Sequence, residues 1–552
     1  MLYNYNKLKN MQYTNIQYTN IQYTQIICYN LYDLHCKIKY FIYFTVFLNI
    51  AAINYLYYKI FSCTNNNLIV LLNHSINLNG CIIIKFIQWI NNHLQFLKND
   101  NVKNDFIEKL FSNYYENCSI HALKYTKKMF FQEFGYLFDD IFVLDDTFKI
   151  KSGSIAQVYK GYIKKTCLPL CKFKSPSLLA FISDKGNHAI SEGVKEKSEI
   201  AIKVVHPEIK YQMIYPIYFV KMYKFFVTNF ICLKKYDTIF NFDSFFDNLK
   251  KQINMVNEYN NNEYFYNKYK NNNIFYIPKP LFKSNNFLIM EYVEGEPFEN
   301  LDISDYKKQI LISFLSIFIK DNYMFGKYVH CDLHDANWKV LKPELNSEIY
   351  KIVIYDFGYV LENDLGETIQ NLIYYLDMNN TYELGKIMFD TVENSISDFH
   401  NENCISDFHN ETELKSYKEE FIDNFVKYNE RCYPYTDNNL IACYNFCYSN
   451  GYKLKKNILD FFISMMLLQK YFKIYIFSNF EDVNHVFNDA NYYKYIYSIN
   501  SFYVSICEKY DVFKQVKDHI NERYILNPFF IEKIKYTNNY FDSLNTNQDF
   551  DI

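Results

Sequence analysis

The sequence predicts an α+β fold in which two lobes are joined by a short polar linker. Apolar residues recur at helical spacing before Thr147 and alternate in the manner of strands after it. The short apolar run Phe287–Val293 is a second strand signal, and it ends at the turn-forming stretch 294–297. Residues 306–325 return to helical spacing, and so does most of the chain beyond Glu362. A strand-rich lobe followed by a helical lobe is therefore expected.

The expected boundaries follow from these changes of pattern. The first lobe covers 147–295, with a polar, irregular insertion at 166–198. The second lobe covers 296–480, with an insertion at 396–411 where the unit Ile-Ser-Asp-Phe-His-Asn-Glu occurs twice. A C-terminal helical tail is expected at 481–552.

Composition excludes some classes of function. The 552 residues carry 58 Lys and Arg against 61 Asp and Glu, a net charge of −3. This balance argues against a general binder of nucleic acid or of anionic membranes. The 14 cysteines form no Cys-x-x-Cys pair, so we do not expect a zinc site.

Residues 1–35 are of low complexity, with the unit Gln-Tyr-Thr-Asn-Ile recurring between positions 12 and 24. Such repeats favour disorder. Asp33 is the only acidic residue before Asp100, and scarce acidic residues are typical of mitochondrial or plastid targeting segments.

The stretch 36–62 is expected to form a transmembrane helix. Its apolar core, Phe41–Phe61, would span about 30 Å as a helix, with tyrosines near both ends. Asn49, Asn54 and Lys59 are costly in lipid, so a peripheral hairpin or a packed helix is the alternative.

A helical extension is expected at 75–146, before the first lobe. Lys85 and Gln88 lie three residues apart in it and therefore on one helix face. By itself this pattern indicates only an amphipathic helix.

The chemistry is expected at Asp332, Asn337 and Asp356. His-x-Asp-x-His-x-x-Asn places Asp332 and Asn337 five residues apart, and a β-branched run delivers Asp356 to a turn at Gly358. Phosphoryl transfer needs a carboxylate near the attacking oxygen and hard oxygen ligands for Mg²⁺. These residues supply both, so Mg²⁺ and a nucleotide are the expected cofactors.

The first lobe offers residues that hold phosphates. A small-residue turn precedes a strand, and the next strand carries Lys203. Small residues allow backbone amides to approach phosphates, and a strand holds a lysine rigidly. Glu258, on a predicted helix, is placed to pair with Lys203; a solvent-facing position is the alternative for each. The expected cofactor-binding residues of the turn are Ser152, Gly153, Ser154 and Ala156.

A nucleotide base would lie against the linker between the lobes. Glu291 and Val293 are the expected contacts there, because they end the last strand before the linker.

Together these motifs resemble the UbiB family of atypical kinases, also called the AarF-domain family, and in particular its mitochondrial, membrane-anchored branch. The resemblance covers roughly Cys81 to Glu362. The matching segments, in family order, are 85–89, 152–161, 199–209, 252–265, 277–280, 288–297, 328–338 and 354–358.

The resemblance implies a protein-kinase-like fold with an N-terminal helical extension over the active site. It also implies ATP binding or hydrolysis, a location in the mitochondrial inner membrane or a plastid, and support of coenzyme Q (ubiquinone) biosynthesis or lipid homeostasis. Membrane lipid, quinone-pathway intermediates or quinone-pathway proteins are the implied partners, without nucleic acid.

Carried over by residue, the resemblance implies that Lys203 holds the phosphates and Glu258 pairs with it. Asp332 becomes the catalytic carboxylate, and Asn337 and Asp356 hold Mg²⁺. Lys85 and Gln88 match the ends of the family's Lys-x-Gly-Gln signature, which blocks the groove for protein substrates. Protein kinase activity is therefore not implied.

Several positions depart from the family pattern. Ile87 replaces the signature glycine, and Gln252 and Asn254 replace an acidic pair before the helix glutamate. Ser152 begins a turn that is alanine-rich in some members.

Two other functions stay open. A small-molecule phosphotransferase of the aminoglycoside or choline-kinase type shares His-x-Asp-x-x-x-x-Asn but lacks the extension with Lys85 and Gln88. A nucleotide-binding pseudokinase scaffold is the other alternative.

Overall fold

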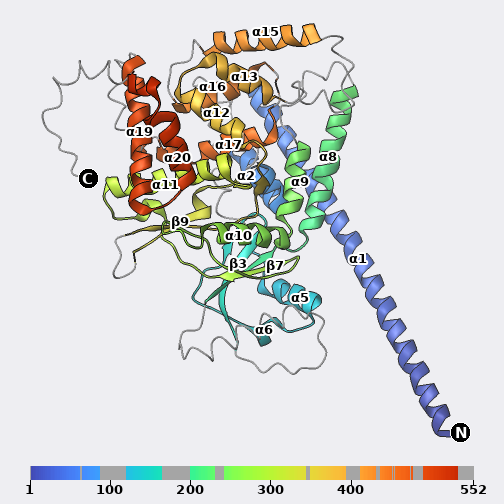
Figure 1. Cartoon of the computed structure of the whole chain (residues 1–552). Helices are drawn as coiled ribbons and strands as arrows, with labels where there is room; N and C mark the ends of the chain where they lie inside the picture. Colours follow the sequence, from blue (N-terminus) through green and yellow to red (C-terminus); the bar gives the residue numbers. More distant parts are fainter. Residues whose placement is uncertain are drawn as a thin grey trace.

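The computed structural model describes most of both predicted lobes (Figure 1). The insertion expected at 166–198 lies outside the described residues, as does all but the last residue of the repeat insertion at 396–411. The described residues are 2–61, 65–87, 120–164, 199–229, 242–343, 349–392, 411–429, 436–450, 452, 454–472, 474–475 and 489–532.

One antiparallel sheet forms the centre of the first lobe. Its strand order is β1-β3-β4-β7-β6, and β2 also pairs with β3. The sheet begins before the predicted boundary at 147, because β1 pairs with the end of β3. Close pairing there requires Gly161, since a Cβ would lie 2.5 Å from the carbonyl oxygen of Val143. The strands are β1 Phe142–Leu144, β2 Lys151–Ser152, β3 Ala156–Ile163, β4 Ile200–Val205, β6 Pro280–Lys283 and β7 Phe287–Glu291.

Both faces of this sheet are covered, so every residue of β4 is buried. On one face the cluster of Ile202, Phe130 and Phe287 packs the sheet against α5 (Leu123–Phe134) and α6 (Phe138–Ile141). On the other face Val205 and Leu288 share a cluster with residues of α9 and α10. Since neighbouring side chains of a strand point to opposite faces, Lys203 faces the side of α10. Helix α8 is Ile209–Asn229, α9 is Phe242–Gln252 and α10 is Met255–Tyr269.

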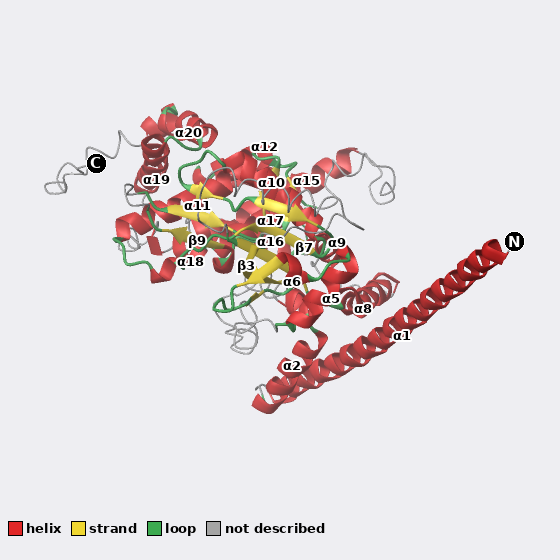
Figure 2. Ribbon diagram, turned by 90° about the horizontal axis from the view of Figure 1, so that it is seen from below, coloured by secondary structure: helices red, strands yellow, loops and turns green. Residues whose placement is uncertain are grey.

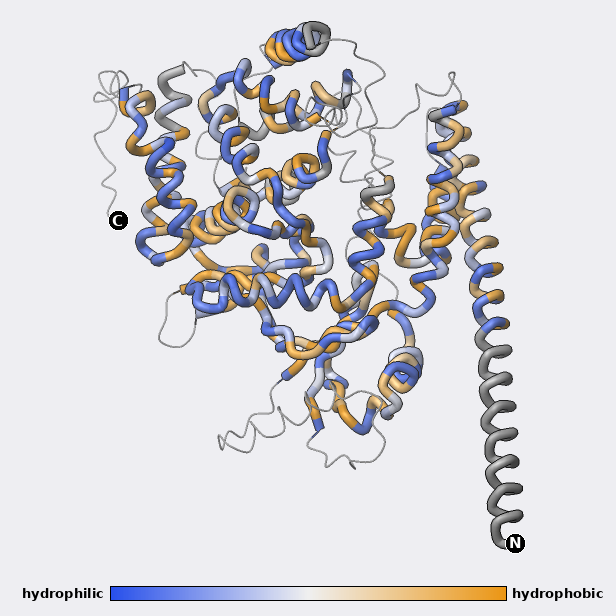
Figure 3. The backbone as a smooth tube through the Cα atoms, turned by 45° about the vertical axis from the view of Figure 1, so that its right-hand side comes forward, coloured by the Kyte–Doolittle hydropathy of each residue, from blue (hydrophilic) through white to orange (hydrophobic). Residues whose placement is uncertain are grey.

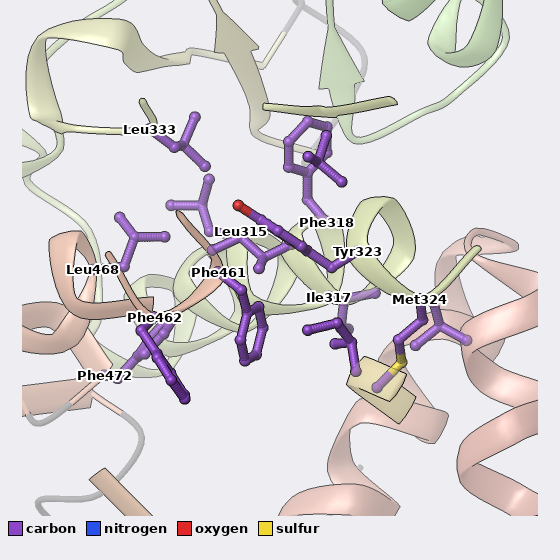
Figure 4. Packing of buried hydrophobic residues seen from close by; sticks show 14 of the residues in the cluster. Leu315, Ile317, Phe318, Tyr323, Met324, Leu333, Phe461, Phe462, Leu468 and Phe472 are labelled. Atoms are coloured by element: carbon purple, nitrogen blue, oxygen red, sulfur yellow. The ribbon is translucent and has the colours of Figure 1, made fainter. Parts of the chain in front are cut away.

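The second lobe is mainly helical and is built around α11, Asp305–Phe325 (Figures 1 and 2). Figure 4 shows side chains of α11 packed with those of α17, and the rings of Tyr323 and Phe461 are 5.1 Å apart. The other helices are α12 Gly366–Asp377, α13 Thr381–Asp390, α15 Glu411–Asn429, α16 Thr436–Ser449, α17 Lys456–Leu467, α18 Gln469–Phe472, α19 Asp489–Tyr510 and α20 Lys514–Ile520. A single π-helical turn, Asn521–Ile525, follows α20.

Two small sheets lie at the junction of the lobes. They carry the loop between β8 and β9 and the loop between β10 and β11. One has the order β5-β10-β9, and the other pairs β8 with β11. Their strands are β5 Phe275–Tyr276, β8 Tyr328–His330, β9 Trp338–Leu341, β10 Lys351–Ile354 and β11 Val360–Glu362, with short 3-10 turns at Phe298–Asn300 and Asp335–Asn337.

The described part of the expected C-terminal helical tail, residues 489–532, packs into the second lobe. Tyr503, Phe513 and Val516, from α19, α20 and the turn between them, lie in the same buried cluster as α11 and α17. The hydroxyl of Tyr503 lies 3.2 Å from that of Ser316 in α11. Aromatic side chains at helical spacing give these helices an apolar face that the core of the lobe buries.

The N-terminal segment differs from the disorder expected over 1–35. The structure has one helix, α1, from Leu2 to Phe61, and this stretch contains no glycine or proline to interrupt it. Cys36, Tyr40 and Phe44 are buried on one face of α1. Figure 3 shows this part of the helix alongside α8, and the rings of Phe44 and Phe219 are 5.9 Å apart. Helix α2, Asn66–Asn79, packs on α1 as well.

Candidate active site

The loop that carries Asp332 and Asn337 runs from β8 to β9 and is tied to the loop after β10. The backbone N–H of Tyr355 donates to the carbonyl of Asn337, 2.8 Å away, and extends the antiparallel pairing of β9 and β10. A nitrogen of His330 lies 3.0 Å from the carbonyl oxygen of Asp356. Asn337 donates from its amide nitrogen to the carbonyl of Asp332 at 2.8 Å. These bonds place Asp332, Asn337 and Asp356 close to one another.

Asp356 has a left-handed backbone, with φ of 50°. Its carboxylate accepts the N–H of Gly358 at 3.0 Å, and this bond stabilises the tight turn. The other carboxylate oxygen lies 3.0 Å from the amine of Lys203. Burial alone would raise the pKa of Asp356, but the charge of Lys203 outweighs it and holds this pKa well below its usual range.

Lys203 and Glu258 form a buried ion pair, with 2.6 Å between Nζ and Oε1. Glu258 is 2% exposed, which rules out the solvated helix face, and Lys203 at 8% exposed does not face solvent. Burial alone would lower the pKa of Lys203, but the carboxylates of Asp356 and Glu258 outweigh it and raise this pKa. Lys203 therefore carries its charge between two carboxylates.

The N-terminal extension reaches this site through Lys85. Its amine lies 2.9 Å from Oδ2 of Asp332. Burial would raise the pKa of Asp332, but Lys85 outweighs it and lowers this pKa. Ile87, at the position of the family's glycine, is buried with Phe44 and Ile76 of α1 and α2. Gln88 lies outside the described residues.

The small-residue turn joins β2 to β3. The N–H of Gly153 donates to the carbonyl of Ala156 at 2.9 Å and closes the turn, while Ala156 is buried in β3. The flanking residues Ser152 and Ser154 are half-buried. Sequence reasoning missed His206, whose Nε2 lies 3.0 Å from the carbonyl oxygen of Gly153. A histidine 53 residues away from the turn gives no local signal of this contact.

The two predicted linker contacts are already engaged within the protein. The carboxylate of Glu291 accepts the hydroxyl of Tyr276 at 2.7 Å and the N–H of Lys279 at 3.2 Å. The carbonyl of Val293 accepts the hydroxyl of Tyr355 at 3.0 Å. Tyr355 therefore lies at the linker, where a base was expected, and the sequence motifs did not identify it.

The donor atoms fit a magnesium ion better than a softer metal. The amide nitrogen of Asn337 is used by Asp332, which leaves the amide oxygen as its available donor atom. With the carboxylate of Asp356 this makes a pair of hard oxygen ligands. Within the described ranges, no group of three or more His, Cys, Asp or Glu side chains is arranged to hold a metal. Asp356 and Asn337 are the residues that would hold Mg²⁺.

Comparison with known proteins agrees with this geometry. Residues 192–384 match the family model described as the ABC1 atypical kinase-like domain. The ABC1 family protein MCP2 homolog of Schizosaccharomyces pombe is 28% identical over 132 residues, which span 22% of this chain and 24% of that protein. The match thus covers about a quarter of the relative's length.

Two solved structures are similar at low identity. One is Rv3197 of Mycobacterium tuberculosis in complex with erythromycin, with 16% identity, a TM-score of 0.34, and coverage of 63% of this chain and 78% of that one. The other is Rio2 kinase of Chaetomium thermophilum in its ADP/Mg²⁺-phosphoaspartate complex, with 11% identity, a TM-score of 0.25, and coverage of 70% and 96%. The family match confirms the predicted resemblance for residues 192–384, which match the ABC1 atypical kinase-like domain within the two-lobed α+β fold.

Proposed function

We propose that this protein binds Mg·ATP and acts as an atypical kinase or ATPase. The observation that carries the proposal is the position of Lys203, held between Glu258 at 2.6 Å and Asp356 at 3.0 Å. A buried amine fixed by one carboxylate beside a second, metal-binding carboxylate is the arrangement that phosphoryl transfer requires.

Each residue then has a defined task. Lys203 binds phosphate oxygens, and Glu258 keeps its amine in place. Asp356 and Asn337 hold Mg²⁺, which neutralises phosphate charge when bound. Asp332 accepts a hydrogen bond from the attacking hydroxyl or water and orients it. Since Lys85 engages Asp332 at 2.9 Å, this carboxylate becomes available only after the extension shifts, which fits a small acceptor or water better than a protein.

Membrane attachment through α1 is the second part of the proposal. Residues 30–61 form a helix that is long and apolar enough to cross a membrane. Only 17% of its most apolar stretch is buried in the protein. One face packs on α2 and α8, yet Ile38, Ile42 and Ile53 on other faces are about half exposed. A helix that is apolar on all sides is stable only when protein or lipid covers it. We infer that lipid covers the outer face.

These features are consistent with a role at the mitochondrial inner membrane, in coenzyme Q biosynthesis or lipid homeostasis. The acceptor would then be a membrane lipid or a quinone-pathway intermediate. A plastid-type organelle is the alternative location.

Nucleotide binding and turnover by the full chain, with and without Mg²⁺, test the proposed chemistry. We expect Mg²⁺-dependent ATP binding, abolished in Lys203→Met and retained in Lys307→Met, which changes an exposed lysine of α11. Binding that is equal in all three proteins would refute the proposal. Binding without turnover, with or without lipid vesicles and a phenolic quinone precursor, would instead support the pseudokinase scaffold.

Flotation with phosphatidylcholine vesicles tests membrane attachment separately. We expect the full chain to float, and the triple variant Ile38→Asn, Ile42→Asn, Ile53→Asn to remain in the soluble fraction. A matched control places asparagine at Tyr306, Tyr382 and Leu526, which are exposed on the second lobe, and should float. Equal flotation of both variants would refute attachment through α1.

A further inference from the structure

A series of polar side chains, all buried except the half-buried His121, runs from the small-residue turn to the segment before α5. His206 lies one residue beyond β4, and its Nε2 is 3.0 Å from the carbonyl oxygen of Gly153. Its Nδ1 is 2.9 Å from Nδ1 of His121. Nε2 of His121 is 2.8 Å from the hydroxyl of Thr126, which is 2.8 Å from the hydroxyl of Tyr159.

The hydrogen bonds assign the tautomer of both histidines. A carbonyl oxygen only accepts, so Nε2 of His206 carries the hydrogen and its Nδ1 accepts. Nδ1 of His121 must then donate, and its Nε2 accepts from Thr126. Partial burial lowers the pKa of His121 to about 4, with a smaller contribution from repulsion by the His206 ring when that ring is protonated, and burial also lowers the pKa of His206. Both rings are therefore neutral at pH 7, as this assignment requires.

The backbone of His121 is fixed to the sheet as well. Its N–H donates to Oε1 of Gln157 at 3.0 Å, and its carbonyl accepts from Nε2 of the same side chain at 3.2 Å. Gln157 is fully buried in β3, directly after the turn. The ring of His121 is thereby held where it meets His206.

The carbonyl of Gly153 has His206 as its hydrogen-bond donor among the described residues. A Cβ added to Gly153 would meet only the carbonyl oxygen of Ala156, at 3.6 Å, which is an ordinary contact. Glycine also has wide backbone freedom. The hydrogen bond from His206 is therefore what holds this carbonyl toward the histidine.

We propose that His206 is a positioning residue that orients the small-residue turn for phosphate, and that His121 sets its tautomer. The proposal rests on the proposed function. In a trans peptide the C=O and the following N–H point in opposite directions. A carbonyl of Gly153 held by His206 thus directs the N–H of Ser154 to the other side of the turn, where it donates to a phosphate oxygen. A carbonyl rotated to that side would repel the phosphate.

Two substitutions of His206 separate positioning from folding. The amide nitrogen of glutamine reaches the place of Nε2, whereas that of asparagine reaches only the place of Nδ1. In the full chain we expect His206→Asn to bind Mg·ATP about tenfold more weakly than wild type, from the loss of one phosphate-directed hydrogen bond. His206→Gln should remain within about threefold. Adenosine, which has no phosphate, should bind all three proteins equally.

The remaining outcomes decide the proposal. Equal Mg·ATP affinity of the asparagine variant and wild type overturns it, and so does an equal loss of adenosine affinity. A wild-type chain that binds no Mg·ATP refutes the proposed function itself. If the asparagine variant does not fold, His121→Leu takes its place. We expect its affinity for Mg·ATP to fall about threefold and its affinity for adenosine to stay unchanged. An unchanged affinity of His121→Leu for Mg·ATP overturns the proposal.

Discussion

The amine of Lys85 lies 2.9 Å from a carboxylate oxygen of Asp332, although 247 residues separate them in the chain. Each side chain is 18% exposed, so the pair lies at the edge of the site rather than in its core. The extension therefore engages the carboxylate that, in the function we propose, orients the attacking oxygen.

Replacing Lys85 by methionine should increase turnover. Without the positive charge the pKa of Asp332 rises, because burial then dominates, and the carboxylate becomes a better acceptor for a proton. We expect ATP turnover to rise about threefold to tenfold, with Lys85→Arg close to wild type because it keeps the charge. Initial rates at saturating Mg·ATP measure this effect. Turnover that falls equally in both variants would mean that Lys85 binds substrate instead.

Replacing Lys203 should cost stability as well as activity. Lys203→Met leaves the carboxylates of Glu258 and Asp356 near each other without their common partner, and removing one member of a buried pair costs about 3 kcal/mol. The double variant Lys203→Met, Glu258→Gln should regain part of this stability and none of the activity. Chemical denaturation measures the first effect and ATP turnover the second. A double variant less stable than the single one would contradict this account.

Asp356→Asn is the sharpest test of the magnesium site. Asparagine tolerates the left-handed backbone and still accepts the N–H of Gly358, so the fold should be retained. It lacks the carboxylate charge, and we expect the affinity for Mg²⁺ in the presence of ATP to fall at least tenfold. Titration of Mg²⁺ at a fixed ATP concentration measures this affinity. Asp364→Asn, in the loop after β11, is the control and should keep the wild-type affinity. A Mg²⁺ dependence equal to that of wild type would place the metal elsewhere.

Acid should destabilise the protein through the half-buried histidines His121 and His519. Burial lowers the pKa of His121 and of His519 to about 4, and their unfolded value is about 6.5. Because the folded pKa is depressed, the unfolded state binds protons first as pH falls. Stability is therefore fully present above about pH 6.5 and is lost progressively down to about pH 4.

The unfolding midpoint in denaturant, measured from pH 7.5 to 4.5, checks this dependence. His519→Gln should flatten the profile, since glutamine does not titrate. A profile unchanged by His519→Gln would show that other groups cause the acid sensitivity.

The motif residues could be predicted because each lies in a short pattern with its own spacing. Lys203 lies in a strand with an alternating residue pattern. Asp332 and Asn337 share a loop, and Asp356 follows a β-branched run. That these side chains lie at one site was implied by the family resemblance.

The residues that were missed depend on contacts between distant segments. His121 and His206 are 85 residues apart, and Tyr355 meets Val293 across the linker. β1 is too short to show a period. The contacts of the expected C-terminal tail could not be predicted, because an apolar helix face does not reveal which lobe buries it.

Glu208 connects the N-terminal helix to the strand that carries Lys203. It lies five residues after Lys203, and its carboxylate accepts hydrogen bonds from Tyr32, Lys39 and Tyr40 of α1 at 3.0, 2.7 and 3.0 Å. Force on α1 is therefore transmitted by this carboxylate together with the packing of α1 on α8. In the membrane-attached state that we propose, bending or thinning of the bilayer would reach the strand of Lys203 by this route.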